Sequence, residues 1–294
     1  MNTIDAHVHF WRLARGDYAW LTPDLGVLYR DYLPEDLAAT LDAQGVTALV
    51  AVQAAQSEAE TRYLLQLART EPRIVGVVGW VDFEAADVAT RIAALCADGA
   101  GLLKGLRPMV QDLADPQWLA RPQLDAAFDA LLQHDLAFDA LVRPLHLPAL
   151  LARLQRHPQL RVVLDHAAKP AIGGADFQAW ADGLAQLAQD PNVVCKLSGL
   201  LPELPAHAAI DDPALAPYVA HLFACFGAQR LLWGSDWPVL TRRTDYAAWM
   251  ALAQAWVAQH AAGDAEAVFA GNARRVYRLS DSIVSSSPTW SPAP

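Results

Sequence analysis

The sequence predicts an α/β protein of the (β/α)8 barrel class, the TIM barrel, from three observations. Short apolar segments alternate with segments of helical periodicity, the alternation runs eight times, and the links are short. Such alternation implies parallel strands, and eight units imply that the sheet closes on itself. The 294 residues are long enough for one barrel, which takes roughly 250. An open doubly wound sheet is the alternative, but the first strand-to-helix connection lacks the Gly-x-Gly-x-x-Gly loop that binds a dinucleotide phosphate.

The predicted strands are short and apolar, and turn-forming or polar residues separate them from the helices. They cover residues 4–10, 46–52, 74–81, 101–106, 136–142, 160–164, 193–197 and 230–233. Helical segments are expected at 33–45, 61–70, 85–97, 122–134, 147–156, 177–189, 217–226, 246–260 and 265–277. The first opens with Pro34 and two acids and ends at Gly45, which are the usual start and stop signals. We expect residues 1–280 to form one distorted barrel with C-terminal helices, and residues 281–294, rich in Ser and Pro, to be a disordered tail.

Composition and charge narrow the class of protein. The chain is 54% hydrophobic and 18% charged, which is typical of a fold with many buried strands. The net charge is -10, without a basic cluster for nucleic acid, and neither a signal peptide nor an apolar run of ~18 residues for a membrane span is present. Three widely spaced cysteines indicate neither a disulfide framework nor a structural zinc site. We therefore expect a cytoplasmic protein that acts on a small molecule, whose oligomeric state has no sequence signal.

The first predicted strand carries a His-x-His pattern. Side chains alternate along a strand, so His7 and His9 share one face and Val8 takes the other. Two adjacent imidazoles at a strand end suit a metal ion or a polarised carbonyl. The alternative is that both histidines only satisfy backbone partners.

Polar side chains also follow the later strands, at the end where barrel enzymes place their catalytic groups. These residues are Gln53, Trp80, Asp82, Arg107, Asp139, His166, Lys196, Ser198 and Asp236. Charged groups are rarely buried together unless they are paired, so this set indicates chemistry rather than packing. Asp236 ends the last strand, beside the first once the barrel closes, and is the candidate general base. Its alternative role is that of a helix N-cap.

Several further residues are candidates for substrate contact. The Arg107 guanidinium offers a fork for a carboxylate, carbonyl or hydroxyl oxygen, with a salt bridge to Asp112 or Asp139 as the alternative. The aromatic segment 11–32 either lines a pocket or only covers the barrel mouth. The residues expected to bind substrate are Arg107, Trp20, Trp80, Gln53 and Lys169. His166 could orient water, bind a metal or polarise a carbonyl, whereas six histidines in or near helices are expected at the surface: His134, His146, His157, His207, His221 and His260.

These residues form a series of motifs in a recognisable order. The motifs are Ile4-Asp5-Ala6-His7-Val8-His9-Phe10-Trp11, Gly16-Asp17-Tyr18-Ala19-Trp20-Leu21, Lys104-Gly105-Leu106-Arg107, Val163-Leu164-Asp165-His166-Ala167-Ala168-Lys169-Pro170, Val194-Cys195-Lys196-Leu197-Ser198-Gly199 and Leu232-Trp233-Gly234-Ser235-Asp236-Trp237-Pro238. The series resembles the amidohydrolase superfamily. More narrowly, it resembles the sugar-lactonase branch that includes L-fuconolactonases, L-rhamnonolactonases and 2-pyrone-4,6-dicarboxylate lactonases. The resemblance covers residue 4 to about residue 280.

The resemblance implies hydrolysis of a sugar-acid lactone such as L-fucono-lactone. By analogy Asp236 deprotonates the attacking water, His7, His9 and His166 surround the scissile ester, and Arg107 holds the carbonyl or sugar hydroxyls. The predicted fifth strand carries no histidine where metal-dependent members usually place a ligand, so we expect no binuclear centre. A single zinc at His7, His9 and Asp236 is compatible with the sequence but not required. The alternatives are a metal-dependent decarboxylase, an amide hydrolase of the same superfamily, and a non-catalytic sugar-binding barrel.

Overall fold

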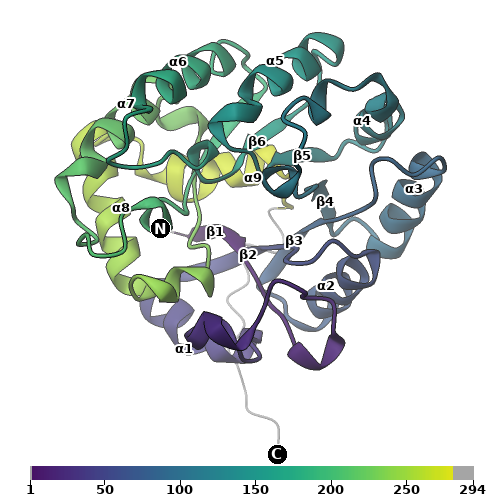
Figure 1. Cartoon of the computed structure of the whole chain (residues 1–294). Helices are drawn as coiled ribbons and strands as arrows, with labels where there is room; N and C mark the ends of the chain where they lie inside the picture. Colours follow the sequence, from purple (N-terminus) through teal and green to yellow (C-terminus); the bar gives the residue numbers. More distant parts are fainter. Residues whose placement is uncertain (1, 281–294) are drawn as a thin grey trace, which may run out of the picture.

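The computed structural model describes residues 2–280 and contains eight parallel strands that follow one another around a barrel (Figure 1). The strands are β1 (Thr3–Val8), β2 (Val46–Val52), β3 (Ile74–Gly79), β4 (Leu103–Leu106), β5 (Ala137–Ala140), β6 (Val162–Leu164), β7 (Val193–Leu197) and β8 (Leu231–Trp233). Each pairs in parallel with the next, from β1 through β8. An isolated parallel bridge between Val8 and Trp237 joins the first strand to the chain just after the last. The predicted (β/α)8 barrel is therefore confirmed.

The helices surround the sheet as an outer layer, except for the last, which lies across the barrel and packs against the strands (Figure 1). They are α1 (Pro34–Gln44), α2 (Glu58–Thr70), α3 (Val88–Gly99), α4 (Asp125–Gln133), α5 (Leu147–Arg156), α6 (Phe177–Leu187), α7 (Ala216–Phe226), α8 (Tyr246–His260) and α9 (Asn272–Val276). Several follow the expected start signals, because Pro34 opens α1 and Ser57 accepts a hydrogen bond from the backbone of Glu60 to cap α2. No helix in this part of the chain is long and apolar enough to cross a membrane.

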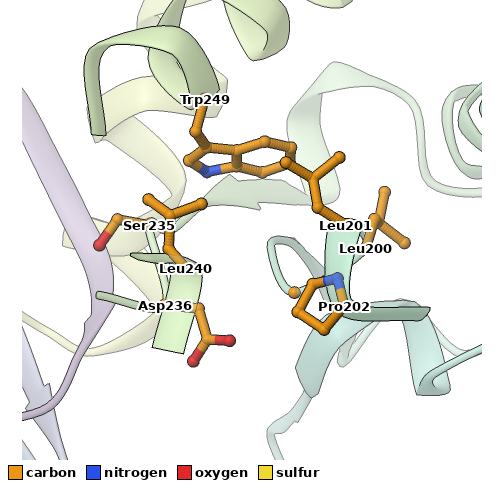
Figure 2. Close-up of a pocket in the computed structure, with 8 residues that line it drawn as sticks. Leu200, Leu201, Pro202, Ser235, Asp236, Leu240 and Trp249 are labelled. Carbon is orange, nitrogen blue, oxygen red and sulfur yellow. The ribbon is translucent and has the colours of Figure 1, made fainter. Parts of the chain in front are cut away.

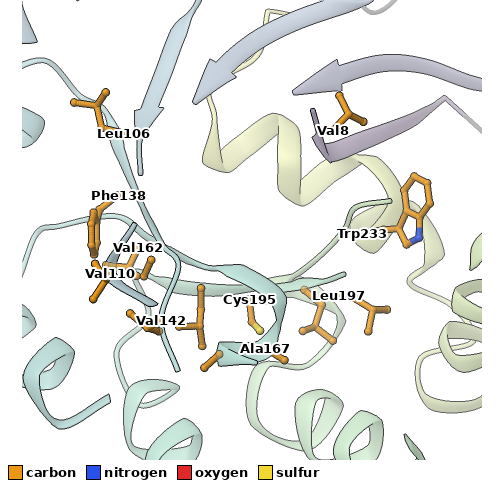
Figure 3. Packing of buried hydrophobic residues seen from close by; sticks show 14 of the residues in the cluster. Val8, Leu106, Val110, Phe138, Val142, Val162, Ala167, Cys195, Leu197 and Trp233 are labelled. Carbon is orange, nitrogen blue, oxygen red and sulfur yellow. The ribbon is translucent and has the colours of Figure 1, made fainter. Parts of the chain in front are cut away.

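Two apolar clusters hold the barrel together. The larger lies between strands and helices and includes Val8, Phe138, Cys195 and Trp233 (Figure 3). The smaller joins strand residues such as Ile4 and Val50 to residues of the C-terminal segment: Ala270, Ala273, Val276, Tyr277 and Leu279. Burial of this apolar surface supplies most of the stabilising free energy. The C-terminal helices are thus an integral part of the barrel core.

The strands are shorter than the sequence patterns suggest. The first was expected to continue to residue 10, but β1 ends at Val8, and the third was expected to reach 81 but β3 ends at Gly79. Apolar character continues into buried loops, so hydrophobicity alone overestimates where the ladder of hydrogen bonds runs. The predicted tail, 281–294, lies outside the described residues.

The aromatic segment 11–32 contains two short 3-10 helices rather than a long helix or strand. An antiparallel bridge between Trp11 and Tyr32 closes it, and the Tyr32 ring packs edge-on against Trp237 at 5.1 Å between centroids. Trp237 follows the last strand, so this contact fixes the segment next to the residues that follow β8.

Candidate active site

The closure of the barrel brings the His-x-His motif against Asp236. The backbone N–H of Asp236 donates to the carbonyl of His7 over 2.8 Å, and that of His9 donates to the carbonyl of Trp237 over 2.7 Å. Asp236 Oδ1 then lies 3.2 Å from His9 Nε2 and 3.7 Å from His7 Nε2. The two Nε2 atoms lie 3.2 Å apart, so the expected sharing of one strand face is confirmed.

The carboxylate of Asp236 contacts these histidines and does not cap a helix. Figure 2 shows it pointing away from the apolar wall that Trp249, Leu201 and Leu240 form beside its backbone. The next short helix begins after Pro238 and has no side-chain cap. The backbone N–H of Trp237 instead donates to Ser235 Oγ over 3.0 Å.

A left-handed turn after β6 places His166 beside the first strand. Four consecutive non-glycine residues, 166–169, have φ between 50° and 58°, a conformation that costs free energy unless its surroundings impose it. Gly199 allows the close approach of the imidazole, because a Cβ at that position would lie 2.4 Å from His166 Nδ1. His166 Nδ1 lies 2.8 Å from Ser198 Oγ, and its Nε2 lies 3.8 Å from Asp236 Oδ1.

Burial controls the charges in this cluster. Burial lowers the pKa of His7 well below its usual value and lowers that of His166 to about 4, so both rings are neutral at pH 7. Burial acts to raise the pKa of Asp236, but the neighbouring imidazoles of His166 and His9 outweigh it and hold that pKa below its usual range. Asp236 is therefore an anionic carboxylate surrounded by imidazoles.

A buried lysine lies beneath His7. Lys196 Nζ is 2.6 Å from Asp139 Oδ2, 2.9 Å from Asp165 Oδ1 and 3.1 Å from His7 Nδ1. The ammonium group donates hydrogen bonds to Asp139 Oδ2 and His7 Nδ1, and its contact with Asp165 Oδ1 is an ion pair. With Lys196 donating to Nδ1, neutral His7 carries its proton on Nε2 and presents an N–H to the site.

Arg107 lies on the other side of His7. Its Nη1 is 3.3 Å from Asp165 Oδ2 and 3.5 Å from His7 Nε2, while its Nη2 donates to the carbonyl of Gln53 over 2.5 Å. Gln53 Nε2 in turn donates to the Arg107 carbonyl over 2.7 Å. In the described part of the chain the ion pair is thus made with Asp165 and not with Asp112 or Asp139. The buried Gln53 supports Arg107.

The other residues expected to bind substrate occupy different environments. The Trp20 side chain is 40% exposed, and its indole N–H donates to the carbonyl of Ala54 over 2.7 Å. Trp80 is half-buried, and Lys169 Nζ lies 3.3 Å from a carboxylate oxygen of Glu203. These residues lie on the loops that follow three different strands, at the end of the barrel where catalytic groups gather.

The donor set fits a single metal ion in part. Ligand atoms of His7, His166 and Asp236 lie within 4.8 Å of one another, and His9 Nε2 lies 3.2 Å from Asp236 Oδ1. His9 donates its Nδ1 proton to the carbonyl of Val52 over 2.8 Å, which leaves the Nε2 lone pair free for a ligand bond. Neutral imidazoles and an ionised carboxylate are the protonation states that a metal requires. His7 fits only if its proton moves to Nδ1, against Lys196.

Some buried polar residues escape sequence reasoning. Tyr277, which follows α9, donates to Asp139 Oδ2 over 2.5 Å. Nothing in the sequence around Tyr277 indicates this contact. Lys196 had a signal, since it is a charged residue within an apolar strand. The prediction that all six peripheral histidines lie at the surface is wrong for His146 and His157, which are buried. His146 Nδ1 accepts the backbone N–H of Arg143 at the start of α5, and His157 lies 3.3 Å from Asp129.

An anionic carboxylate beside imidazoles and a guanidinium, at the carboxyl end of a (β/α)8 barrel, defines a hydrolase-type site. Residues 4–279 match the amidohydrolase family model, and the chain belongs to that family. It is 47% identical to an L-fucono-1,5-lactonase of Burkholderia ambifaria over 94% of this chain and 95% of that protein. It is 38% identical to an L-fucono-1,5-lactonase of Burkholderia multivorans over 94% of this chain and 96% of the relative.

A solved structure is similar across the whole fold. It is an amidohydrolase from Burkholderia multivorans with bound zinc, 36% identical in sequence, with a TM-score of 0.87 over 95% of this chain and all of that one. The predicted family is confirmed.

Proposed function

We propose that this protein hydrolyses the 1,5-lactone of a sugar acid, with L-fucono-1,5-lactone as the first candidate substrate. The observation that carries the proposal is the ionised Asp236 within 3.8 Å of three imidazoles at the barrel mouth. The two lactonases at 47% and 38% identity support the substrate class, since each matches over 94% of this chain.

In the proposed reaction Asp236 takes a proton from water, and the resulting hydroxide forms a bond to the lactone carbonyl carbon. The negative charge moves to the carbonyl oxygen, where the His7 Nε2–H and the Arg107 Nη1–H, 3.5 Å apart, both donate. The bond between the carbonyl carbon and the ring oxygen then breaks. The ring oxygen takes the proton from Asp236, and the free hydroxy acid ionises and releases a proton to solution.

Neighbouring side chains position Asp236, the attacking water and the substrate in this proposal. His9 Nε2 lies 3.2 Å from Asp236 Oδ1, and His166 lies close enough to Asp236 to hold the water or to relay its proton. The exposed indole of Trp20 offers a flat face for the C–H side of a sugar ring, and Trp80 and Lys169 offer further contacts from neighbouring loops.

We propose that a metal is not required for this reaction. When bound, an ion such as Zn²⁺ would be held by His7, His9, His166 and Asp236 and would supply Lewis-acid polarisation of the carbonyl. Because Lys196 donates to His7 Nδ1, the His7 Nε2–H is available to polarise the same carbonyl. The side chains of the protein can therefore stabilise the oxyanion without a metal ion.

A pH-indicator assay with a panel of aldono-1,5-lactones tests the proposal. Acid release above the spontaneous rate, retained after chelation and dialysis, is the expected result for L-fucono-1,5-lactone. Activity that disappears with the chelator and returns with Zn²⁺ would overturn the metal-independent reaction. No acid release above the spontaneous rate with any lactone would overturn the proposed substrate class.

A further inference from the structure

Three consecutive backbone carbonyls, beginning at the last residue of β2, each accept a hydrogen bond from a different side chain of the candidate site. The acceptors and their donors are Val52 with His9 Nδ1 at 2.8 Å, Gln53 with Arg107 Nη2 at 2.5 Å, and Ala54 with Trp20 Nε1 at 2.7 Å. We call residues 52–55 the carbonyl rail. Its position sets the orientation of a base partner, a guanidinium and an aromatic face at once.

Two N–H groups of this rail, those of Ala54 and Ala55, donate to a buried carboxylate from the next helix, whereas the N–H of Gln53 donates to the carbonyl of Val78 over 2.8 Å. Both oxygens of Glu60 accept from the backbone of Ala54, over 2.9 and 3.1 Å, and one also accepts from Ala55 over 2.9 Å. Glu60 lies in the first turn of α2, where the helix dipole favours an acid, and its side chain is 0% exposed.

Placing a carboxyl group there is costly. Burial raises the pKa of Glu60 to about 7, although hydrogen bonds from Ala54 and Ala55 and the charge of Arg107 act in the opposite direction. Asp17 on the aromatic segment adds a like charge nearby. An apolar residue would avoid this cost but would leave two buried N–H groups unpaired.

We propose that Glu60 is a positioning residue that holds Ala54 and Ala55 of the carbonyl rail and, through the carbonyls of Gln53 and Ala54, Arg107 and Trp20. The proposal rests on the proposed lactonase activity only for its kinetic consequence. The Glu60 side chain forms hydrogen bonds with the backbone of Ala54 and Ala55 and none with the reacting groups, so its positional effect passes through these two residues, beside the attraction between its charge and that of Arg107.

Amide hydrogen exchange tests the contact without any substrate. In Glu60→Gln one acceptor oxygen becomes an N–H donor, so we expect faster exchange at Ala54 and Ala55, with unchanged protection in β5–β8. The matched control is Glu58→Gln, from the same helical turn, whose carboxylate pairs with Arg62 and Arg91 at the surface. Unchanged exchange at Ala54 and Ala55, or equal loss of protection throughout the barrel, would overturn the proposal.

Kinetics test the consequence for the site. We expect Glu60→Gln to lower kcat/KM by roughly 10- to 100-fold, the usual effect of removing a supporting partner, mainly through KM. Glu58→Gln should remain near wild type. A double-mutant cycle with Trp20→Phe should be non-additive, since both changes act on the Ala54 contact. Additive losses, or a loss of kcat/KM through kcat alone, would contradict positioning through the rail.

Two further measures keep these outcomes separate. If Glu60→Gln does not fold, Glu60→Asp, which keeps the charge but is one methylene shorter, is measured in both assays and must show the same local exchange. If the wild-type protein hydrolyses no lactone, the proposed function fails, while the exchange result still decides whether Glu60 holds the rail.

Discussion

His9 Nε2 lies 3.2 Å from Asp236 Oδ1, although 227 positions separate the two residues along the chain. Barrel closure alone makes this contact, because His9 follows the first strand and Asp236 follows the last. The proposed general base and its partners are therefore assembled only when the whole sheet has formed. Stability of the barrel and integrity of the site should consequently change together when the closure is disturbed.

The buried lysine is the first test of this coupling. Lys196→Met leaves Asp139 without its cation, Asp165 with Arg107 alone and His7 without its donor, so we expect a loss of about 3–5 kcal/mol in the free energy of unfolding. Activity should fall with it. Tyr277→Phe removes one hydrogen bond to Asp139 and should cost only about 1 kcal/mol. Urea unfolding of both variants measures the difference, and equal losses would contradict the central role of Lys196.

Gly199 tests the placement of His166. Gly199→Ala puts a methyl group 2.4 Å from His166 Nδ1 at a residue with φ of 59°, so both contact and backbone conformation are unfavourable. We expect a loss of more than about 1 kcal/mol in stability together with a fall in kcat. Gly263→Ala is the control, because a Cβ there meets nothing within 4 Å. A Gly199→Ala protein with wild-type kcat would show that the position of His166 is not critical.

The buried Glu60 predicts a pH dependence of stability. Its pKa rises from 4.5 to about 7 on folding, so the folded state binds its proton more tightly than the unfolded state. The contribution of the protonated group is fully present below pH 4.5 and is lost as the pH rises through about 7. The stability of wild type relative to Glu60→Gln should therefore decrease over this interval. Thermal unfolding of both proteins at several pH values measures this difference in stability. A difference that increases with pH would contradict the raised pKa of Glu60.

The fold and the outline of the site follow from the sequence because both depend on short-range patterns. Strand–helix alternation predicted the barrel, and closure predicted that Asp236 would meet His7 and His9. Partners in the interior depend on register instead. The contacts of Lys196 with Asp139 and Asp165 require the relative positions of three strands, and Tyr277 arrives from the C-terminal segment.

Glu60 shows a different limit of sequence reasoning. An acid in the first turn of an amphipathic helix is typical of a solvent-exposed position, because glutamate is rarely buried. Glu60 is buried here because the backbone N–H groups of residues 54–55 donate to its carboxylate. The contact between Glu60 and this loop therefore becomes evident only from the structure.

The most direct test of the account is the rate of L-fucono-1,5-lactone hydrolysis by chelator-treated wild type and Asp236→Asn protein. Asparagine keeps the shape of the side chain but cannot take a proton from water. We expect a loss of roughly 10²- to 10⁴-fold in kcat with an unchanged fold by circular dichroism. An Asp236→Asn protein that retains wild-type kcat would contradict the assignment of Asp236 as the base.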